Sequence, residues 1–373
     1  MFLDSAGSSL MSASTLAAVQ QHLELEARIG GYAAADQVAT RLSELRSSVA
    51  RLVGSDDPEE IALSDSGTRA WTSCFYSIPL APGQTILLTG PEYASNAIAA
   101  LQRAEQAGAQ VSFVAQNPDG GIDLDDLEAK LHTADVAAIS LVQVPTNGGL
   151  VGDVRTAAAL AHQAGAFVLL DGCQSVGQLA VDVNDLDIDA LACTGRKWLR
   201  GPRGTGMLWV RRRSLERLRP AMLDLRSASW TGPTTYEVAE SARRFEFWEQ
   251  DVAALVGLAA ALDEALDYGI ERIEQAVRRR ARYLRTQLAS LGRVNVHDPD
   301  DGSGIVSFTV EGLDPVTVQQ RLREQRVTTT VSRRPSTLVD MTRRNLLAVG
   351  RASPHYFVSD SDLDRAVSVL AAL

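Results

Sequence analysis

The chain has 373 residues, of which 45% are hydrophobic and 22% charged, as in an ordinary soluble globular protein. Its net charge of −10 at pH 7 argues against a nucleic-acid-binding protein, which needs a basic face. It shows no signal peptide and no apolar run near the roughly 20 residues that span a bilayer, and its three cysteines have no metal-type spacing. We therefore expect a cytoplasmic protein with no metal, nucleic-acid partner or membrane segment.

Between about residues 60 and 210, short apolar runs alternate with Ala-rich helical stretches such as residues 94–108 and 154–164. The strand-like runs are residues 61–63, 85–88, 111–114, 137–142, 167–170, 190–193 and 207–210. This rhythm predicts an α/β fold whose large domain holds a mostly parallel seven-stranded sheet flanked by helices. No helix precedes the last run, which leaves an antiparallel orientation open for it.

After Phe247 the pattern changes to apolar residues at steps of three or four, from Leu262 to Leu291. Gly269 interrupts this stripe, so one broken helix and two abutting helices fit equally well. A strand at 305–310 and helices at 316–325 and 360–373 complete a smaller α+β domain. We assign residues 15–246 to the large domain, and residues 1–14 and 247–373, including the connecting helix, to the small one.

Two charged side chains follow the ends of successive strand-like runs. Asp171 ends the run at 167–170, and Lys197 lies in the loop after 190–193. Because ligands of open α/β sheets bind beyond the carboxyl ends of the strands, the two should meet. A lysine can form a Schiff base with pyridoxal phosphate (PLP), and a carboxylate can keep the pyridine nitrogen protonated. Taken singly, Asp171 could cap a helix and Lys197 could be a solvated amine; the pair indicates a PLP site.

Three more features lie at strand ends. The Ser66–Thr68 turn leads into a helix, where free N–H groups and the positive helix end attract phosphate. Gln174 could donate to the cofactor's phenolic oxygen, although a solvated loop amide is an equal alternative. Tyr93 could stack on the pyridine ring, although in isolation a core or surface tyrosine is more common.

With these motifs the chain resembles the class V aminotransferase-fold enzymes, which are PLP-dependent, of fold-type I, and related to cysteine desulfurases and C–S lyases. The Asp-Gly-x-Gln segment at 171–174 and the Lys197–Trp198 pair carry the resemblance. Residues 2–7, 144–149 and 350–356 are similar to the family's opening, its cofactor loop and its substrate-carboxylate motif.

The resemblance implies a role for each site residue. Lys197 would carry the Schiff base and move protons at the substrate's α-carbon, and Asp171 would pair with the pyridinium. Arg351 would bind the α-carboxylate of an amino acid; without the resemblance we would expect an ordinary surface arginine at this position. The remaining cofactor-binding residues would be Gly67, Thr68 and Thr194 at the phosphate, Tyr93 on the ring, Gln174 at the phenolic oxygen, and Thr146 in the cofactor loop.

Two departures narrow the function. Desulfurases carry a nucleophilic cysteine in a loop of the small domain, but residues 328–337 contain none, and Cys173 reads as a packing residue. Arg196 replaces the histidine that desulfurases have before the lysine, a variant similar to the C–S lyases of the ergothioneine pathway. Arg196 could bind substrate or phosphate, or form an outward salt bridge. We therefore expect β-elimination from a cysteine conjugate or sulfoxide, giving pyruvate and ammonia.

Other outcomes stay open from sequence alone. An aminotransferase or an epimerase would use the same site, and a non-catalytic scaffold would need neither Lys197 nor Asp171. The resemblance also implies a homodimer with active sites at its interface. The family's Gly-Thr pair, which reaches the phosphate from the partner, is absent near residues 247–248, and residues 230–232 are a possible substitute.

Overall fold

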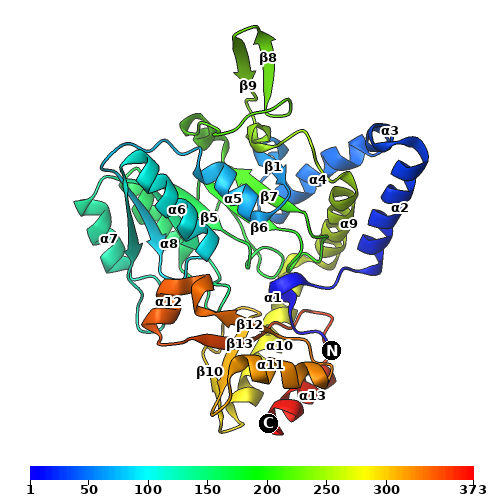
Figure 1. The fold of residues 1–373 in the computed structure, drawn as a ribbon, viewed down its shortest axis with the longest axis vertical. Helices are drawn as coiled ribbons and strands as arrows, with labels where there is room; N and C mark the ends of the chain where they lie inside the picture. The colour runs from blue at the N-terminus through cyan, green and yellow to red at the C-terminus, as the bar shows by residue number, and fades with distance from the viewer.

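A computed structural model describes all 373 residues. Its centre is a seven-stranded sheet with the order β1-β7-β6-β5-β4-β2-β3 (Figure 1). β7 is antiparallel to both of its neighbours, and the other pairs are parallel. The prediction of a mostly parallel seven-stranded sheet is confirmed, and the orientation left open is antiparallel. The strands are β1 (Ile61–Ser64), β2 (Thr85–Thr89), β3 (Gln110–Val114), β4 (Val136–Val142), β5 (Phe167–Asp171), β6 (Ala190–Thr194) and β7 (Gly206–Val210).

Helices cover both faces of this sheet because successive strand residues point to opposite sides. On β2, Ile86 and Leu88 share a core with α5 (Gly67–Phe75) and α6 (Ala94–Ala107). Leu87 belongs to the opposite core, which also holds α7 (Leu124–Thr133) and α8 (Val154–Gln163). Strands buried on both faces explain the continuously apolar runs in the sequence.

The N-terminal part forms helices that the sequence analysis did not predict: α2 (Ala13–Ile29), α3 (Gly31–Gln37) and α4 (Ala39–Leu52). Both α2 and α4 pack against α9 (Val252–Tyr268), and α10 (Ile270–Ala289) follows it. Gly269, with φ of +92°, separates α9 from α10, which settles the choice in favour of two helices. A positive φ costs glycine little, so the chain can turn there.

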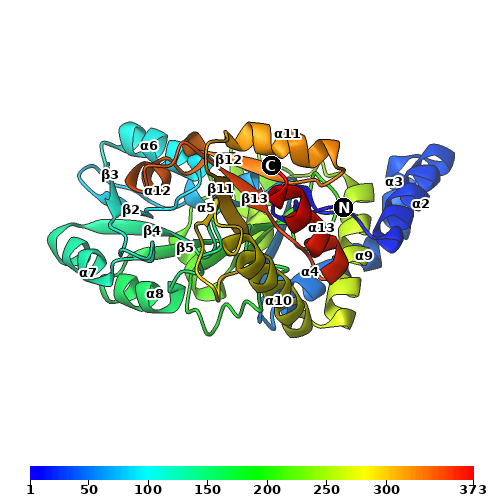
Figure 2. The same cartoon turned by 90° about the horizontal axis from the view of Figure 1, so that it is seen from below.

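A second sheet of four antiparallel strands has the order β10-β11-β13-β12. It forms a separate core with α10, α11 and α13, which lie together in Figure 2. The predicted strand at 305–310 corresponds to β11, and the predicted helices at 316–325 and 360–373 correspond to α11 and α13; β10, β12, α12 and β13 were missed. The elements are β10 (Val294–Val296), β11 (Val306–Val310), α11 (Pro315–Glu324), β12 (Thr330–Arg333), α12 (Leu338–Arg343), β13 (Ala348–Ala352) and α13 (Asp360–Ala371).

The start of the chain lies against this second sheet. Phe2 bridges to Thr328 and Asp4 to Ser353, just before α1 (Ser5–Ser8). The grouping of the first residues with the small domain, with boundaries at residues 14 and 246, stays a prediction. The chain also has four short 3-10 helices: η1 (Pro58–Glu60), η2 (Arg212–Arg217), η3 (Ala242–Phe245) and η4 (Arg334–Thr337).

One hairpin, β8 (Ala228–Gly232) with β9 (Thr235–Val238), projects from the large domain, away from the small one (Figure 1). Trp230 and Tyr236, which pair across it, are 78% and 63% exposed. No helix in the structure is both long and apolar enough to cross a membrane.

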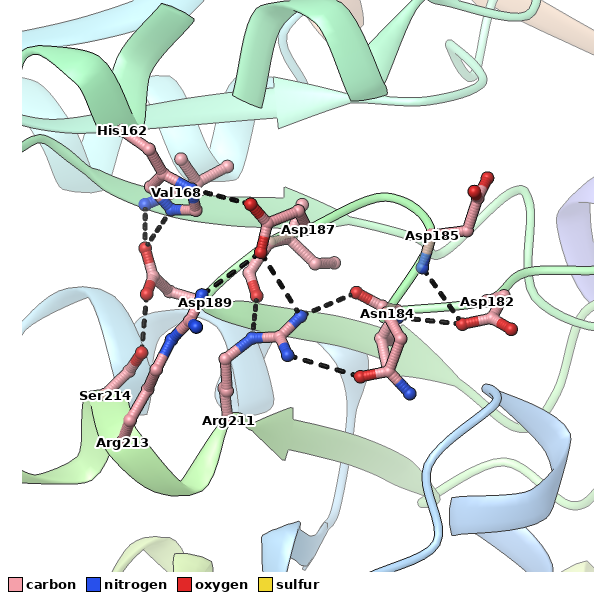
Figure 3. A network of polar contacts seen from close by, with 12 residues as sticks. His162, Val168, Asp182, Asn184, Asp185, Asp187, Asp189, Arg211, Arg213 and Ser214 are labelled. Atoms are coloured by element: carbon pink, nitrogen blue, oxygen red, sulfur yellow. Dashed lines mark hydrogen bonds and ion pairs between the residues drawn. The ribbon is translucent and has the colours of Figure 1, made fainter. Parts of the chain in front are cut away.

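A polar network lies at the amino ends of β5 and β6, on the sheet edge opposite Asp171 (Figure 3). The Asp189 carboxylate accepts hydrogen bonds from His162 Nε2, Val168 N and Ser214 Oγ, the first two at 2.9 Å. The hydrogen bond with Asp189 raises the pKa of His162, with Asp187 adding to the effect and burial opposing it. The network ties α8 to both strands and to η2.

Candidate active site

One cavity collects the site residues that the sequence analysis singled out. It lies at the carboxyl ends of the parallel strands, where ligands of such sheets bind. Arg351 is the single exception: it does not line the cavity, but its Nη1 donates to Thr146 at the cavity wall. The predicted residues in the lining are Gly67, Thr68, Tyr93, Thr146, Asp171, Gln174, Thr194, Arg196 and Lys197.

Asp171 ends β5 and is 8% exposed. Its Oδ1 accepts from the backbone N–H of Cys173 at 2.9 Å, and its Oδ2 accepts from Asn96 Nδ2 at 2.9 Å. Asp171 forms no ion pair within the protein, so its negative charge remains available to a cationic group in the cavity. A protonated pyridine nitrogen is such a group.

Lys197 presents a free amine to the same cavity. Its Nζ makes no hydrogen bond or ion pair within the protein. Burial lowers the pKa of Lys197, and the charges of Arg196 and Arg351 lower it further, while Cys173 and Asp171 oppose the shift. A lowered pKa increases the fraction of neutral amine, which is the form that attacks an aldehyde or accepts a proton.

The phosphate end fits an anion closely. α5 begins at Gly67, and its N-cap Ser66 accepts from Arg69 N at 3.1 Å, which leaves the N–H groups of Gly67 and Thr68 to a ligand. A Cβ on Gly67 would lie 2.5 Å from Cys173 Sγ and 3.3 Å from Thr194 Cβ, so only glycine fits this cradle. Thr194 Oγ1 donates to Thr205 O at 3.2 Å, so its proton is used inside the protein.

Gln174 is held by three protein partners. Its Oε1 accepts from Trp198 Nε1 at 3.0 Å, and its Nε2 donates to Ala6 O at 3.0 Å and to Thr146 Oγ1 at 3.2 Å. Thr146 Oγ1 also accepts from Arg351, which leaves the Thr146 proton for another acceptor. Both side chains line the cavity as predicted, and their roles toward a phenolic oxygen stay predictions.

The two arginines contact the start of the chain. Arg196 lines the cavity, donates to Gly7 O and forms no salt bridge, so the alternative of an outward ion pair is not what the structure has. Arg351 is buried and pairs with Asp4, from Nη2 to Oδ1, at 3.2 Å. Tyr93, 41% exposed, is the N-cap residue of α6 and lies at the cavity.

Sequence reasoning missed Asn96, which binds the Asp171 carboxylate. It lies three residues after Tyr93, in the first turn of α6. Residues three apart on a helix share a face, so this spacing was the available signal. With Lys197, Asp171 and the α5 cradle in one cavity, the residues fit a phosphate-bearing pyridine aldehyde.

Comparisons with known proteins agree with this geometry. The cysteine desulfurase CsdA of Escherichia coli superposes with a TM-score of 0.91 at 25% identity, covering 100% of this chain and 94% of that one. The cystine C-S lyase C-DES superposes with a TM-score of 0.87 at 24% identity, covering 99% of this chain and 97% of that one. A C-DES mutant has been solved with glycine covalently linked to the PLP cofactor, so the predicted cofactor is one that a protein of this fold binds.

Two curated relatives show the sequence similarity. A probable cysteine desulfurase of Halalkalibacterium halodurans is 29% identical over 72% of this chain and 67% of its own length. A probable hercynylcysteine sulfoxide lyase of Mycobacterium tuberculosis is 31% identical over 100% of this chain and 90% of its own length. The match to the first three desulfurases thus covers about two thirds of their own length. A family model for class-V aminotransferases matches residues 1–366, and the chain therefore belongs to the aminotransferase class-V family.

Proposed function

We propose that this PLP-dependent enzyme is a C–S lyase, which cleaves the carbon–sulfur bond of a cysteine conjugate or cysteine sulfoxide by β-elimination. The observation that carries the proposal is the free amine of Lys197 in one cavity with Asp171, without a reactive thiol beside them. The full-length similarity to a probable hercynylcysteine sulfoxide lyase supports the same class of substrate.

The thiol chemistry disfavours a desulfurase. Cys173 is the cysteine in the cavity lining, and burial, together with the Asp171 charge, raises its pKa well above its usual value. The thiol is therefore protonated at neutral pH and a poor nucleophile. Residues 328–337, which include β12 and η4, contain no cysteine. Neither site therefore offers a thiolate that would take up the substrate's sulfur as a persulfide.

The residues divide the work as follows. Bound PLP supplies an electron-accepting ring for the α-carbon. Asp171 would pair with the positively charged ring nitrogen, and the α5 cradle would hold the phosphate. Lys197 removes the α-proton, after which the Cβ–S bond breaks and sulfur leaves as thiolate or sulfenate with the bonding pair. The three-carbon remainder reacts with water to give pyruvate and ammonia.

Product analysis tests the proposal. Purified PLP-loaded protein is incubated with a panel of S-substituted cysteines and their sulfoxides, and the products are measured. A lyase should release pyruvate and ammonia in equal amounts. Transfer of an amino group to an added keto acid would instead identify an aminotransferase. Loss of α-carbon stereochemistry without pyruvate would identify an epimerase, and either result would refute the lyase.

We also propose that the enzyme acts as a cytoplasmic homodimer. A two-stranded hairpin with exposed aromatic side chains is marginally stable alone, so we expect another protein surface to pack against β8–β9. The hairpin does not line the cavity of its own chain, which leaves residues 230–232 to serve the phosphate site of a partner. Three free cysteines are compatible with a reducing compartment.

A further inference from the structure

One amide joins two buried carboxyl groups beneath the cofactor site. Asn96 Nδ2 donates to Asp171 Oδ2 at 2.9 Å and to Glu92 Oε1 at 2.8 Å. A primary amide nitrogen has two hydrogens, so these two bonds use both. Asn96 is 2% exposed, and no water is needed to complete the bridge.

Glu92 has no cationic partner in this position. It is 3% exposed and forms no salt bridge; its Oε1 also accepts from Tyr93 N at 3.0 Å. Its Oε2 is buried without any hydrogen-bond partner, as is the hydroxyl of Ser140 on the neighbouring strand β4. Asp171 on β5 is the charged group that acts on it. Burying an ionised carboxylate with an unpartnered oxygen costs more free energy than burying the neutral, protonated group.

Glu92 and Asp171 together favour a single negative charge. Two carboxylates this close in a buried site do not both ionise readily. Burial and the Asp171 charge raise the pKa of Glu92 to about 8, against the opposing hydrogen bonds of Asn96 and Tyr93. Asp171 faces the cavity, where a cationic ring nitrogen would stabilise its negative charge, and Glu92 does not line the cavity.

We propose that Glu92 is a positioning residue that stays protonated and, through Asn96, fixes the Asp171 carboxylate toward the cofactor nitrogen. This inference rests on the proposed function because it assigns Asp171 to that nitrogen. A neutral Glu92 leaves Asp171 as the single negative charge of the pair, so the cofactor nitrogen would interact with a full carboxylate charge. Removing the acceptor would let the Asn96 amide rotate and release Asp171 Oδ2.

Infrared spectroscopy of the PLP-free protein tests the proton directly. At neutral pH the wild type should show a protonated-carboxyl C=O band that disappears in Glu92→Gln and persists in Glu216→Gln, a control on an exposed glutamate. Absence of that band, or its survival in Glu92→Gln, would overturn the proposal. This readout does not depend on bound cofactor or on turnover.

PLP binding tests the positioning role. Glutamine mimics a protonated glutamate, so Glu92→Gln should bind PLP within about twofold of wild type, while Glu92→Ala should bind about tenfold or more weakly. Equal losses in both variants would refute a neutral Glu92, and no loss in either would refute positioning. If wild-type protein does not bind PLP, the proposed function fails, and the infrared band still decides the protonation of Glu92.

Discussion

Arg351 Nη2 lies 3.2 Å from Asp4 Oδ1, so the arginine expected to grip the substrate is paired with a carboxylate from the start of the chain. Residues 347 positions apart in sequence thus meet beside the cavity wall. Burial raises the pKa of Asp4, and the Arg351 charge opposes this shift. A substrate carboxylate would approach a guanidinium that is already oriented.

Arg351→Gln should raise KM for the amino-acid substrate by about 10- to 100-fold, because charge-assisted hydrogen bonds to the carboxylate are lost. The single variant should also lower the free energy of unfolding, since the partly buried Asp4 is left without its cation. Steady-state kinetics and urea unfolding measure the two effects. The double variant Asp4→Asn/Arg351→Gln should regain stability but keep the high KM; a normal KM would refute substrate binding by Arg351.

Cys173→Ala should retain turnover within about threefold of wild type, because a thiol with a raised pKa does not act as the nucleophile. Kinetic assays with a cysteine conjugate give the rate, and intact-protein mass spectrometry shows whether sulfur accumulates on the chain. Cys74→Ala, at a buried site away from the cavity, serves as the packing control. A specific collapse of activity in Cys173→Ala, with a persulfide on wild-type Cys173, would point to a desulfurase.

The network of Figure 3 should make stability depend on pH at both ends of the range. Because the folded pKa of His162 is raised above 6.5, its contribution is complete below that pH and is lost as pH rises through the folded value. Burial opposes the shift in Asp189, but hydrogen bonds from His162, Ser214 and Val168 hold its pKa below 3.8. Its contribution is present above that pH and is lost as pH falls through the lowered value.

His162→Gln should therefore remove up to about 1 kcal/mol of unfolding free energy near pH 6 and progressively less at higher pH. Chemical unfolding from pH 5 to 9 measures this difference. His132→Gln, on an exposed histidine of α7 without a carboxylate partner, should show no such trend. A loss for His162→Gln that is constant with pH would contradict a charged His162.

Trp230→Ser should shift the protein from dimer toward monomer, because the exposed ring is the largest apolar group on the projecting hairpin. Analytical ultracentrifugation over a range of concentrations measures the shift. Leu347→Ser, which is 75% exposed on the small domain, is the matched control and should not change the mass. A wild-type protein that is monomeric at every concentration would refute the dimer.

Local patterns were sufficient for the central sheet and for most of the site. The strands of the large sheet are continuously apolar because both faces are covered, and Lys197 and Asp171 meet because parallel strands end at one edge. The small sheet was harder to predict, since β10 and β12 are short and partly exposed, and the mostly buried β13 contains Gly350 and Arg351 and gives little periodic signal. The pairing of Arg351 with Asp4 depends on a tertiary contact that no local pattern encodes. The spacing of Asn96 from Tyr93 indicated a shared face but not the hydrogen bonds of Asn96 to Asp171 and Glu92.

The most direct test is reduction of the PLP-loaded protein with borohydride, followed by peptide mass spectrometry. Lys197 should carry the reduced pyridoxyl group, and Lys197→Ala should carry none and lose pyruvate formation. Lys130→Ala, on the salt-bridged lysine of α7, should behave as wild type. A pyridoxyl group on another residue, or unchanged turnover in Lys197→Ala, would contradict the assignment of Lys197 as the amine that holds the cofactor.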